Sequence, residues 1–253
     1  MNRFTIIGTG NVAAWFADRI RKTGGVIKEV YGRTPGKTAD FAARFGSLPI
    51  NDLRKLSPHS DLYIFAVTDD AYPAVIAEVP FMMPCAIHTA GAVPISVFKD
   101  KASRFGTIYP FQTISAKGDF DDLTVPLCVE GESPETEDYL LKTAILWSET
   151  AKLLNEEQRQ RLHLAAVFSC NFTNALYGIA FTLLKEKKLD PQLLFPLLEN
   201  TLQKIKTMSP KEAQTGPAIR RDQQTINGHL SQLTNPQFRE VYELMTKIIQ
   251  NND

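Results

Sequence analysis

The chain has 253 residues, 43% of them hydrophobic, which is enough to bury a sizeable core and to form two domains of ordinary size. Lysine plus arginine equals aspartate plus glutamate, at 28 each, so no strong electrostatic field favours a polyanion. We therefore expect neither a nucleic-acid partner nor a membrane partner.

Targeting and redox features indicate a cytoplasmic protein. Met1-Asn2-Arg3 leads straight into the first expected strand, which leaves no room for a secretory signal. No apolar run is seen to approach the roughly 18 residues of a spanning helix. The cysteines, at positions 85, 128 and 170, are scattered among apolar neighbours, so we expect buried, reduced thiols and no metal site.

The first twenty residues have the pattern of a strand, a glycine turn and a helix. Residues 4–7 are β-formers, and apolar residues recur at helical spacing over residues 14–21. Gly8 permits a tight turn, Gly10 lets a pyrophosphate approach the backbone, and Ala13 lets the helix pack closely. Glycines can also end a strand without a function, but this motif joins a strand to a helix, whose N-terminus favours phosphate. We expect a phosphate site formed by Gly8, Thr9, Gly10, Asn11 and Val12.

The end of the second strand indicates which dinucleotide is bound. That strand covers residues 26–31, and Arg33 follows it at the position where an NAD site usually has a carboxylate. An arginine there can pair with the 2′-phosphate of NADP, and Thr34 and Lys37 can add a hydroxyl and a second charge. The alternative is that Arg33 is only a solvated residue at a strand end. We expect NADP(H) as the cofactor.

The first half continues as an alternation of strands and helices. The strand over residues 61–67 is almost entirely apolar, as in the middle of a parallel sheet. We predict a Rossmann domain, a doubly wound and mainly parallel α/β sheet, over residues 1–154. Its further elements are expected at residues 38–45, 48–50, 52–56, 71–79, 84–87, 107–109, 125–130, 134–147 and 150–154.

Two strands of this sheet end in polar or small residues. In such sheets ligands bind outside the carboxyl ends of the strands. His88 follows the strand at residues 84–87 and is either a hydrogen-bonded surface group or a catalytic residue. The cofactor contacts expected at the two strand ends are Val67, Thr68, Asp69, Thr89, Ala90 and Gly91.

The second half, residues 155–253, is predicted to be an all-helical domain. Asn155 is a plausible N-cap for one long helix over residues 156–187, about 48 Å in length and expected to be buried and central. On this helix His163, Asn171 and Asn174 form a polar stripe that either lines a cleft or bonds to neighbouring backbone. Further helices are expected at residues 190–206, 210–214, 222–233 and 236–250.

A second polar cluster precedes and opens the helix at residues 222–233. Asp222, Thr225 and His229 share one helical face, and Arg220 comes just before it. Arginine can clamp a carboxylate, and the other three side chains can orient one another. The alternative is a helix cap with a solvated face.

The combination of these motifs resembles a family of Rossmann-like NADP oxidoreductases with a helical C-terminal domain of unknown function. More distantly it is similar to pyrroline-5-carboxylate reductase, ketopantoate reductase and 6-phosphogluconate dehydrogenase. Ala90 stands where many members have serine, Arg221 where many have glycine, and the lysine of the hydroxyacid dehydrogenases has no counterpart. The resemblance rests on G-x-G-x-x-A, His88 to Gly91, Tyr109 to Thr113, His163 to Val167, Asn171 and Gly216 to His229.

The resemblance implies an NADP(H)-dependent oxidoreductase that acts on a small carbonyl or imine compound bound between its domains. A non-catalytic NADP(H) sensor is the alternative. His163 is the leading candidate for the proton donor, His88 is second, and Asn171 would orient the substrate. Substrate contacts are expected from Asn174, Arg220, Asp222, Thr225 and His229. The related reductases also lead us to expect a homodimer through the C-terminal domain.

Overall fold

The computed structural model describes residues 2–115 and 124–251. The chain divides into two compact units, Met1–Val167 and Phe168–Asp253. The domain boundary expected after residue 154 stays a prediction. The compact units divide inside the long helix, whose first turns bond to the sheet unit through Arg159.

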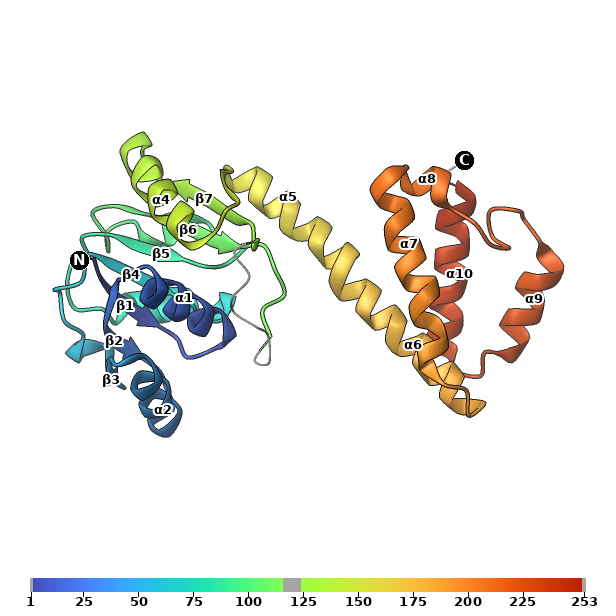
Figure 1. The fold of residues 1–253 in the computed structure, drawn as a ribbon, viewed down its shortest axis with the longest axis horizontal. Coiled ribbons are helices and arrows are strands. Elements are labelled where there is room, and N and C mark those ends of the chain that lie inside the picture. Colours follow the sequence, from blue (N-terminus) through green and yellow to red (C-terminus); the bar gives the residue numbers. More distant parts are fainter. Residues whose placement is uncertain (1, 116–123, 252–253) are drawn as a thin grey trace. The chain divides into compact units, whose positions relative to one another are not determined.

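The first unit contains a single eight-stranded sheet with the order β3-β2-β1-β4-β5-β6-β7-β8 (Figure 1). All its neighbouring strands are parallel except β6 and β7. The strand order reverses between β1 and β4, so the mainly parallel, doubly wound sheet is as predicted. The strands are β1 (Arg3–Ile7), β2 (Val26–Tyr31), β3 (Leu48–Ile50), β4 (Leu62–Phe65), β5 (Ala86–His88), β6 (Phe105–Pro110), β7 (Leu127–Gly131) and β8 (Ala151–Leu153).

Helices cover both faces of this sheet. Successive residues of a strand point to opposite faces, so apolar side chains on each face pack into a separate core. Ile6 belongs to the core cluster that includes Trp147, whereas the adjacent Ile7 belongs to the cluster that includes Phe98. Both residues are fully buried. The helices are α1 (Asn11–Lys22), α2 (Pro35–Phe45), α3 (Tyr72–Ala77) and α4 (Pro134–Trp147), with 3₁₀ turns at Leu53–Lys55, Asp69–Ala71 and Ile95–Phe98.

The register of the strands aligns their carboxyl ends. Ile7 pairs with Tyr31 on β2 and with Phe65 on β4. Phe65 in turn pairs with His88 on β5, and His88 pairs with Thr107 on β6. The residues that follow β1, β2, β4 and β5 are therefore delivered to the same edge, where such sheets bind their ligands.

The described residues after β8 are mainly helical, as predicted. One continuous helix, Glu156–Glu186, comprises α5 (Glu156–Ala166), a π-helical segment (Val167–Phe172) and α6 (Thr173–Glu186). Asn155 caps it through a capping box with Gln158. The other helices are α7 (Phe195–Thr207) after a 3₁₀ turn (Pro191–Leu194), α8 (Pro210–Ala213), α9 (Gln223–Gln232) and α10 (Pro236–Asn251).

The exposure of the long helix differs from the prediction. It contains an 18-residue window that is apolar enough to cross a membrane by length and composition alone, and none of that window is buried. The helix was expected to be buried, and no apolar run of this length was expected. Both expectations were wrong. The apolar run was missed because Ser, Cys, Asn and Thr interrupt it without adding charge. Signal sequences and the core helices of soluble proteins, which are mostly buried, pass the same test. Cys85 and Cys128 are buried thiols as expected, but Cys170 on this helix is exposed.

Candidate functional site

The turn after β1 has the geometry that a bound pyrophosphate needs. Gly8 has a φ of +129°, and a Cβ there would lie 2.1 Å from the carbonyl oxygen of Ala66. A Cβ on Gly10 would meet only open space, and Ala13 is fully buried against the sheet. Gly10, the N-cap of α1, makes no side-chain capping hydrogen bond. The first N–H groups of a helix can bind an anion, so this turn fits a phosphate, and the contacts expected from Gly8 to Val12 stay predictions.

The residues expected to select NADP follow β2. Arg33, Thr34 and Lys37 are all exposed. Thr34 is the N-cap of α2, but its side chain makes no capping hydrogen bond. Two exposed cations and a hydroxyl thus follow the end of β2, which fits a 2′-phosphate.

The residues after β4 and the residues after β5 differ in their exposure to solvent. Thr68 and Asp69 are exposed, and Val67 is half-buried. By contrast, Thr89 is buried, with its hydroxyl donating to the carbonyl of Phe65 at 3.4 Å and its N–H donating to Tyr72 Oη at 3.4 Å. Ala90 and Gly91 are buried as well. Side chains after β4 can reach a ligand, whereas the loop after β5 is held by the protein itself.

His88 is part of the protein core. It is fully buried and stacks on Phe98 at a centroid distance of 6.0 Å. Its Nδ1 accepts the N–H of Ala90 at 3.2 Å, and its Nε2 has no hydrogen-bond partner among the described residues. Burial, aided by the charge of Arg159, lowers the pKa of His88 to about 3. The expectation that His88 could donate a proton is therefore corrected, because it stays neutral near physiological pH.

His163 and Tyr109 form a hydrogen-bonded pair within the first unit. Tyr109 Oη and His163 Nδ1 lie 3.0 Å apart. The imidazole rests on Gly91, where a Cβ would come within 2.6 Å of Nδ1. Burial raises the pKa of Tyr109 to about 12, with further contributions from Cys128 and then from Asp69. The phenol is therefore protonated at neutral pH, and the pair can hold and transfer a proton beside the loop after β5.

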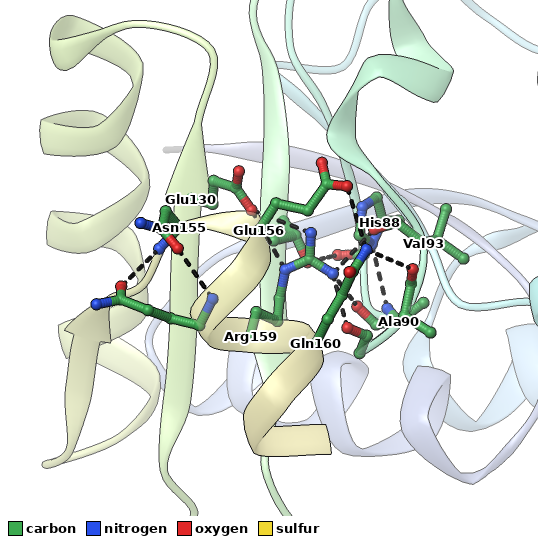
Figure 2. A network of polar contacts seen from close by, with 12 residues as sticks. His88, Ala90, Val93, Glu130, Asn155, Glu156, Arg159 and Gln160 are labelled. Carbon is green, nitrogen blue, oxygen red and sulfur yellow. Dashed lines mark hydrogen bonds and ion pairs between the residues drawn. The ribbon is translucent and has the colours of Figure 1, made fainter. Parts of the chain in front are cut away.

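Figure 2 shows a second polar network around Arg159 on α5. This side chain is fully buried and forms an ion pair with Glu130 on β7, with 3.0 Å between Nη2 and Oε2. Its Nη1 donates to backbone carbonyls of the loop after β5. Sequence reasoning missed both Tyr109 and Arg159 as site residues. Arg159 lies in a charged run, Glu-Glu-Gln-Arg-Gln-Arg, that does not distinguish it from the exposed Arg161.

The other predicted site residues belong to the second unit. Asn171 and Asn174 are exposed. Asp222 caps α9 and accepts hydrogen bonds from the N–H of Thr225 at 3.1 Å and from its hydroxyl at 2.7 Å. His229 does not join them. Its Nδ1 shares a 2.8 Å hydrogen bond with Tyr242 Oη on α10.

Asp222 thus has the capping role that was the alternative interpretation. Its hydrogen bonds with Thr225, and then the nearby charge of Arg220, lower the pKa of the Asp222 carboxyl. The substrate roles of Asn171, Asn174, Arg220, Asp222, Thr225 and His229 stay predictions.

Two known families match different parts of the chain. Residues 3–84 match the family described as NADP oxidoreductase, coenzyme F420-dependent. Residues 125–249 match the domain of unknown function DUF2520. No curated protein matches the chain.

Solved structures resemble the chain over most of its length. A protein from Bacteroides fragilis described as a putative NADP oxidoreductase is 34% identical, with a TM-score of 0.92, and the match covers 99% of this chain and 98% of that one. 1-Pyrroline-5-carboxylate reductase from Streptococcus pyogenes is 13% identical, with a TM-score of 0.63 and 98% of each chain covered. A reductive aminase from Aspergillus terreus, in complex with NADPH and ethyl 5-oxohexanoate, is 18% identical, with a TM-score of 0.64, and the match covers 81% of this chain and 74% of that one.

The last two proteins share only the fold, because their identities are low. The Bacteroides protein is similar enough over its whole length to show the family. The chain belongs to the NADP oxidoreductase family that joins a Rossmann-like domain to a C-terminal DUF2520 domain.

Proposed function

We propose that the protein is an NADP(H)-dependent reductase that transfers hydride between the nicotinamide and a small carbonyl or imine compound. The hydrogen-bonded pair of Tyr109 and His163 carries this proposal. In a doubly wound sheet the dinucleotide crosses the carboxyl ends of the strands at the point where their order reverses. Here that point lies between β1 and β4, with Arg33 on one side and β5 on the other. The nicotinamide half would therefore reach the side where the loop after β5 contacts His163.

In this reaction the residues of the protein bind the cofactor and donate a proton. The turn from Gly8 to Val12 binds the pyrophosphate, and Arg33 with Lys37 binds the 2′-phosphate. The cofactor, when bound, supplies the hydride. Reduction of a C=O or C=N bond also needs one proton on the oxygen or nitrogen. Tyr109 and His163 hold that proton in a shared hydrogen bond, and either can pass it to the developing anion or amine.

The substrate class follows from this donor set. A phenol and an imidazole can protonate either an oxygen or a nitrogen. The reductive aminase that shares the fold was solved with NADPH and a keto ester, and the pyrroline-5-carboxylate reductase is named for a cyclic imine. These names support screening ketones and imines first.

The test is NADPH oxidation by the purified protein with a panel of cyclic imines, and of ketones with and without an amine. His163→Asn keeps a polar side chain but loses proton transfer, so it should lower turnover by about 10²- to 10⁴-fold. His59→Asn, at the loop histidine, is the matched control and should leave turnover unchanged. If NADPH binds but no compound in the panel oxidises it, the sensor alternative gains instead.

We also infer that the protein is a homodimer through its helical unit. Large apolar side chains are exposed along α6, α7 and α10, among them Leu176, Leu197 and Leu244. Soluble monomers rarely expose this much apolar surface on one unit, and a symmetric copy would cover it.

A further inference from the structure

We propose that Arg159 is a positioning residue that fixes the loop after β5 (residues 89–93) against α5, and so sets the site of the nicotinamide relative to His163. The inference rests on the proposed NADP(H) site. Arg159 would touch neither cofactor nor substrate. It would act through the backbone it holds.

The contacts of Arg159 are unusual for an arginine. Its side chain is 0% exposed, so the guanidinium has lost its water. A buried charge persists only when it is paired and hydrogen-bonded. Nε and Nη2 both donate to Oε2 of Glu130, at 3.3 and 3.0 Å. Nη1 donates to the carbonyls of Ala90, Gly91 and Val93, at 3.3, 2.8 and 2.9 Å.

These bonds fix a continuous stretch of backbone. The remaining carbonyl of the stretch, that of Ala92, accepts from Nε2 of Gln160 at 3.4 Å. Two adjacent side chains of α5 thus hold all four carbonyls from Ala90 to Val93, as Figure 2 shows for the labelled members of this group. Loops at ligand sites usually retain freedom to move, whereas these peptide planes are set by a charged group that cannot leave without breaking several bonds.

The same contacts connect the loop to the Tyr109 and His163 pair. His163 lies one helical turn after Arg159, on the same side of α5. Its ring contacts Gly91, whose carbonyl Arg159 holds. Glu130 pairs with Thr107 across β6 and β7, and Tyr109 follows two residues later on β6. Arg159 therefore links α5, β7 and the loop after β5, the three elements that surround the pair.

A positioning role and a purely structural role predict different binding data. The adenine half of NADPH would lie over β1 and β2, and the nicotinamide half over β4 and β5. Loss of the loop's fixed geometry should therefore weaken ligands that carry a nicotinamide and leave the adenine half unaffected. A general loss of fold would weaken both.

The experiment compares Arg159→Met with Arg161→Met, the matched control at an exposed arginine on the same helix. Binding of NADPH and of adenosine 2′,5′-bisphosphate, which lacks the nicotinamide half, is measured by calorimetry. Arg159→Met should weaken NADPH by about tenfold or more, a difference that calorimetry resolves readily. It should leave the bisphosphate within about twofold, and Arg159→Lys, which keeps the charge but not the planar fork, should restore NADPH binding only in part.

A second measurement separates this inference from the proposed function. Hydrogen exchange of the amides of residues 90–93 should be faster in Arg159→Met than in the unmutated protein, with no change in the amides of β1 and β4. This result does not depend on catalysis, so it can hold even if no substrate is reduced. Equal losses for both ligands, an unchanged NADPH affinity, or unchanged exchange in the loop would overturn the positioning role.

Discussion

Among single residues, some members of the candidate site can be identified from the sequence, and others can be identified only from the fold. Gly8, Gly10 and Arg33 occupy fixed offsets from a strand, so their roles follow from local geometry. Tyr109 and His163 are 54 positions apart, and only the fold brings them together. His88 shows the opposite error. A histidine at a strand end was taken as a candidate donor because the sequence does not reveal that the next elements cover it.

We propose that Arg33 selects NADP(H) over NAD(H). Arg33→Asp removes a charge-assisted contact to the 2′-phosphate, worth about 1.5 to 3 kcal/mol, and adds repulsion. We expect NADPH affinity to fall by about tenfold to a hundredfold while NADH affinity changes little, as measured by calorimetry. Arg161→Asp, the same charge reversal elsewhere, should change neither. Equal affinities of the unmutated protein for both dinucleotides would contradict the assignment.

The buried state of His88 makes stability depend on pH. Its pKa is about 3 in the folded protein, against about 6.5 in an unfolded chain. Between about pH 6.5 and pH 3 only the unfolded state binds a proton on the His88 imidazole. The free energy of unfolding therefore decreases as the pH falls through this range. Between pH 7 and pH 5 the loss from this group should be about 2 kcal/mol.

The measurement is urea unfolding followed by fluorescence, since both tryptophans, Trp15 and Trp147, lie in the first unit. His88→Gln should flatten the dependence on pH between 7 and 5, whatever its effect on absolute stability. His59→Gln, at a histidine outside the core, should keep the slope of the unmutated protein. The same slope in His88→Gln would show that other groups cause it.

At the scale of secondary structure, the sequence predicted what local chemistry decides. The bounds of α4 agree with the expected residues 134–147, and Asn155 begins the long helix as its capping box requires. Two features were not predictable. The antiparallel pairing of β7 depends on a partner strand rather than on its own residues. The π-helical segment, Val167–Phe172, contains only residue types that also occur in α-helices, so its sequence does not distinguish it from one.

Arg221 has a strained backbone conformation just before α9. Its φ of +55° is in the left-handed region, which costs a non-glycine residue about 1 kcal/mol or more. The family resemblance places glycine here in many members, and the backbone geometry gives the reason. Arg221→Gly should therefore stabilise the helical unit by about 0.5 to 1 kcal/mol after the entropy gained by the unfolded chain is allowed for.

Hydrogen exchange of the amides of α9 measures this effect. They should exchange more slowly in Arg221→Gly. The neighbouring Arg220→Gly lacks the strain to relieve and should give equal or faster exchange. Faster exchange in Arg221→Gly would mean that the arginine side chain contributes more than its backbone strain costs.

At the scale of the whole molecule, the exposed apolar surface of the helical unit favours assembly. Phe168 is 62% exposed and Phe172 is 51% exposed, and the two rings contact each other. Burial of such side chains contributes about 1.5 to 3 kcal/mol each. Light scattering at micromolar concentration should therefore give twice the chain mass of 28.3 kDa.

Charge at this surface should dissociate the dimer. Phe168→Glu combined with Phe172→Glu is expected to give a monomer. Leu146→Glu, at an equally exposed apolar residue on α4 of the first unit, is the matched control and should remain a dimer. A monomer for the unmutated protein would contradict the assembly proposal but would leave the cofactor site untouched.

In the proposed reaction, hydride passes from NADPH to a carbonyl or imine carbon while the Tyr109 and His163 pair supplies the proton. The most direct measurement uses NADPH deuterated at the transferring position of the nicotinamide, with the products analysed by mass spectrometry. The product should contain one deuterium, and Tyr109→Phe should form it about 10²-fold more slowly or worse, with little change in KM. Tyr177→Phe, at an exposed tyrosine of α6, should match the unmutated protein. NADPH that binds without transferring deuterium to any product, or a Tyr109→Phe variant as fast as the unmutated protein, would contradict it.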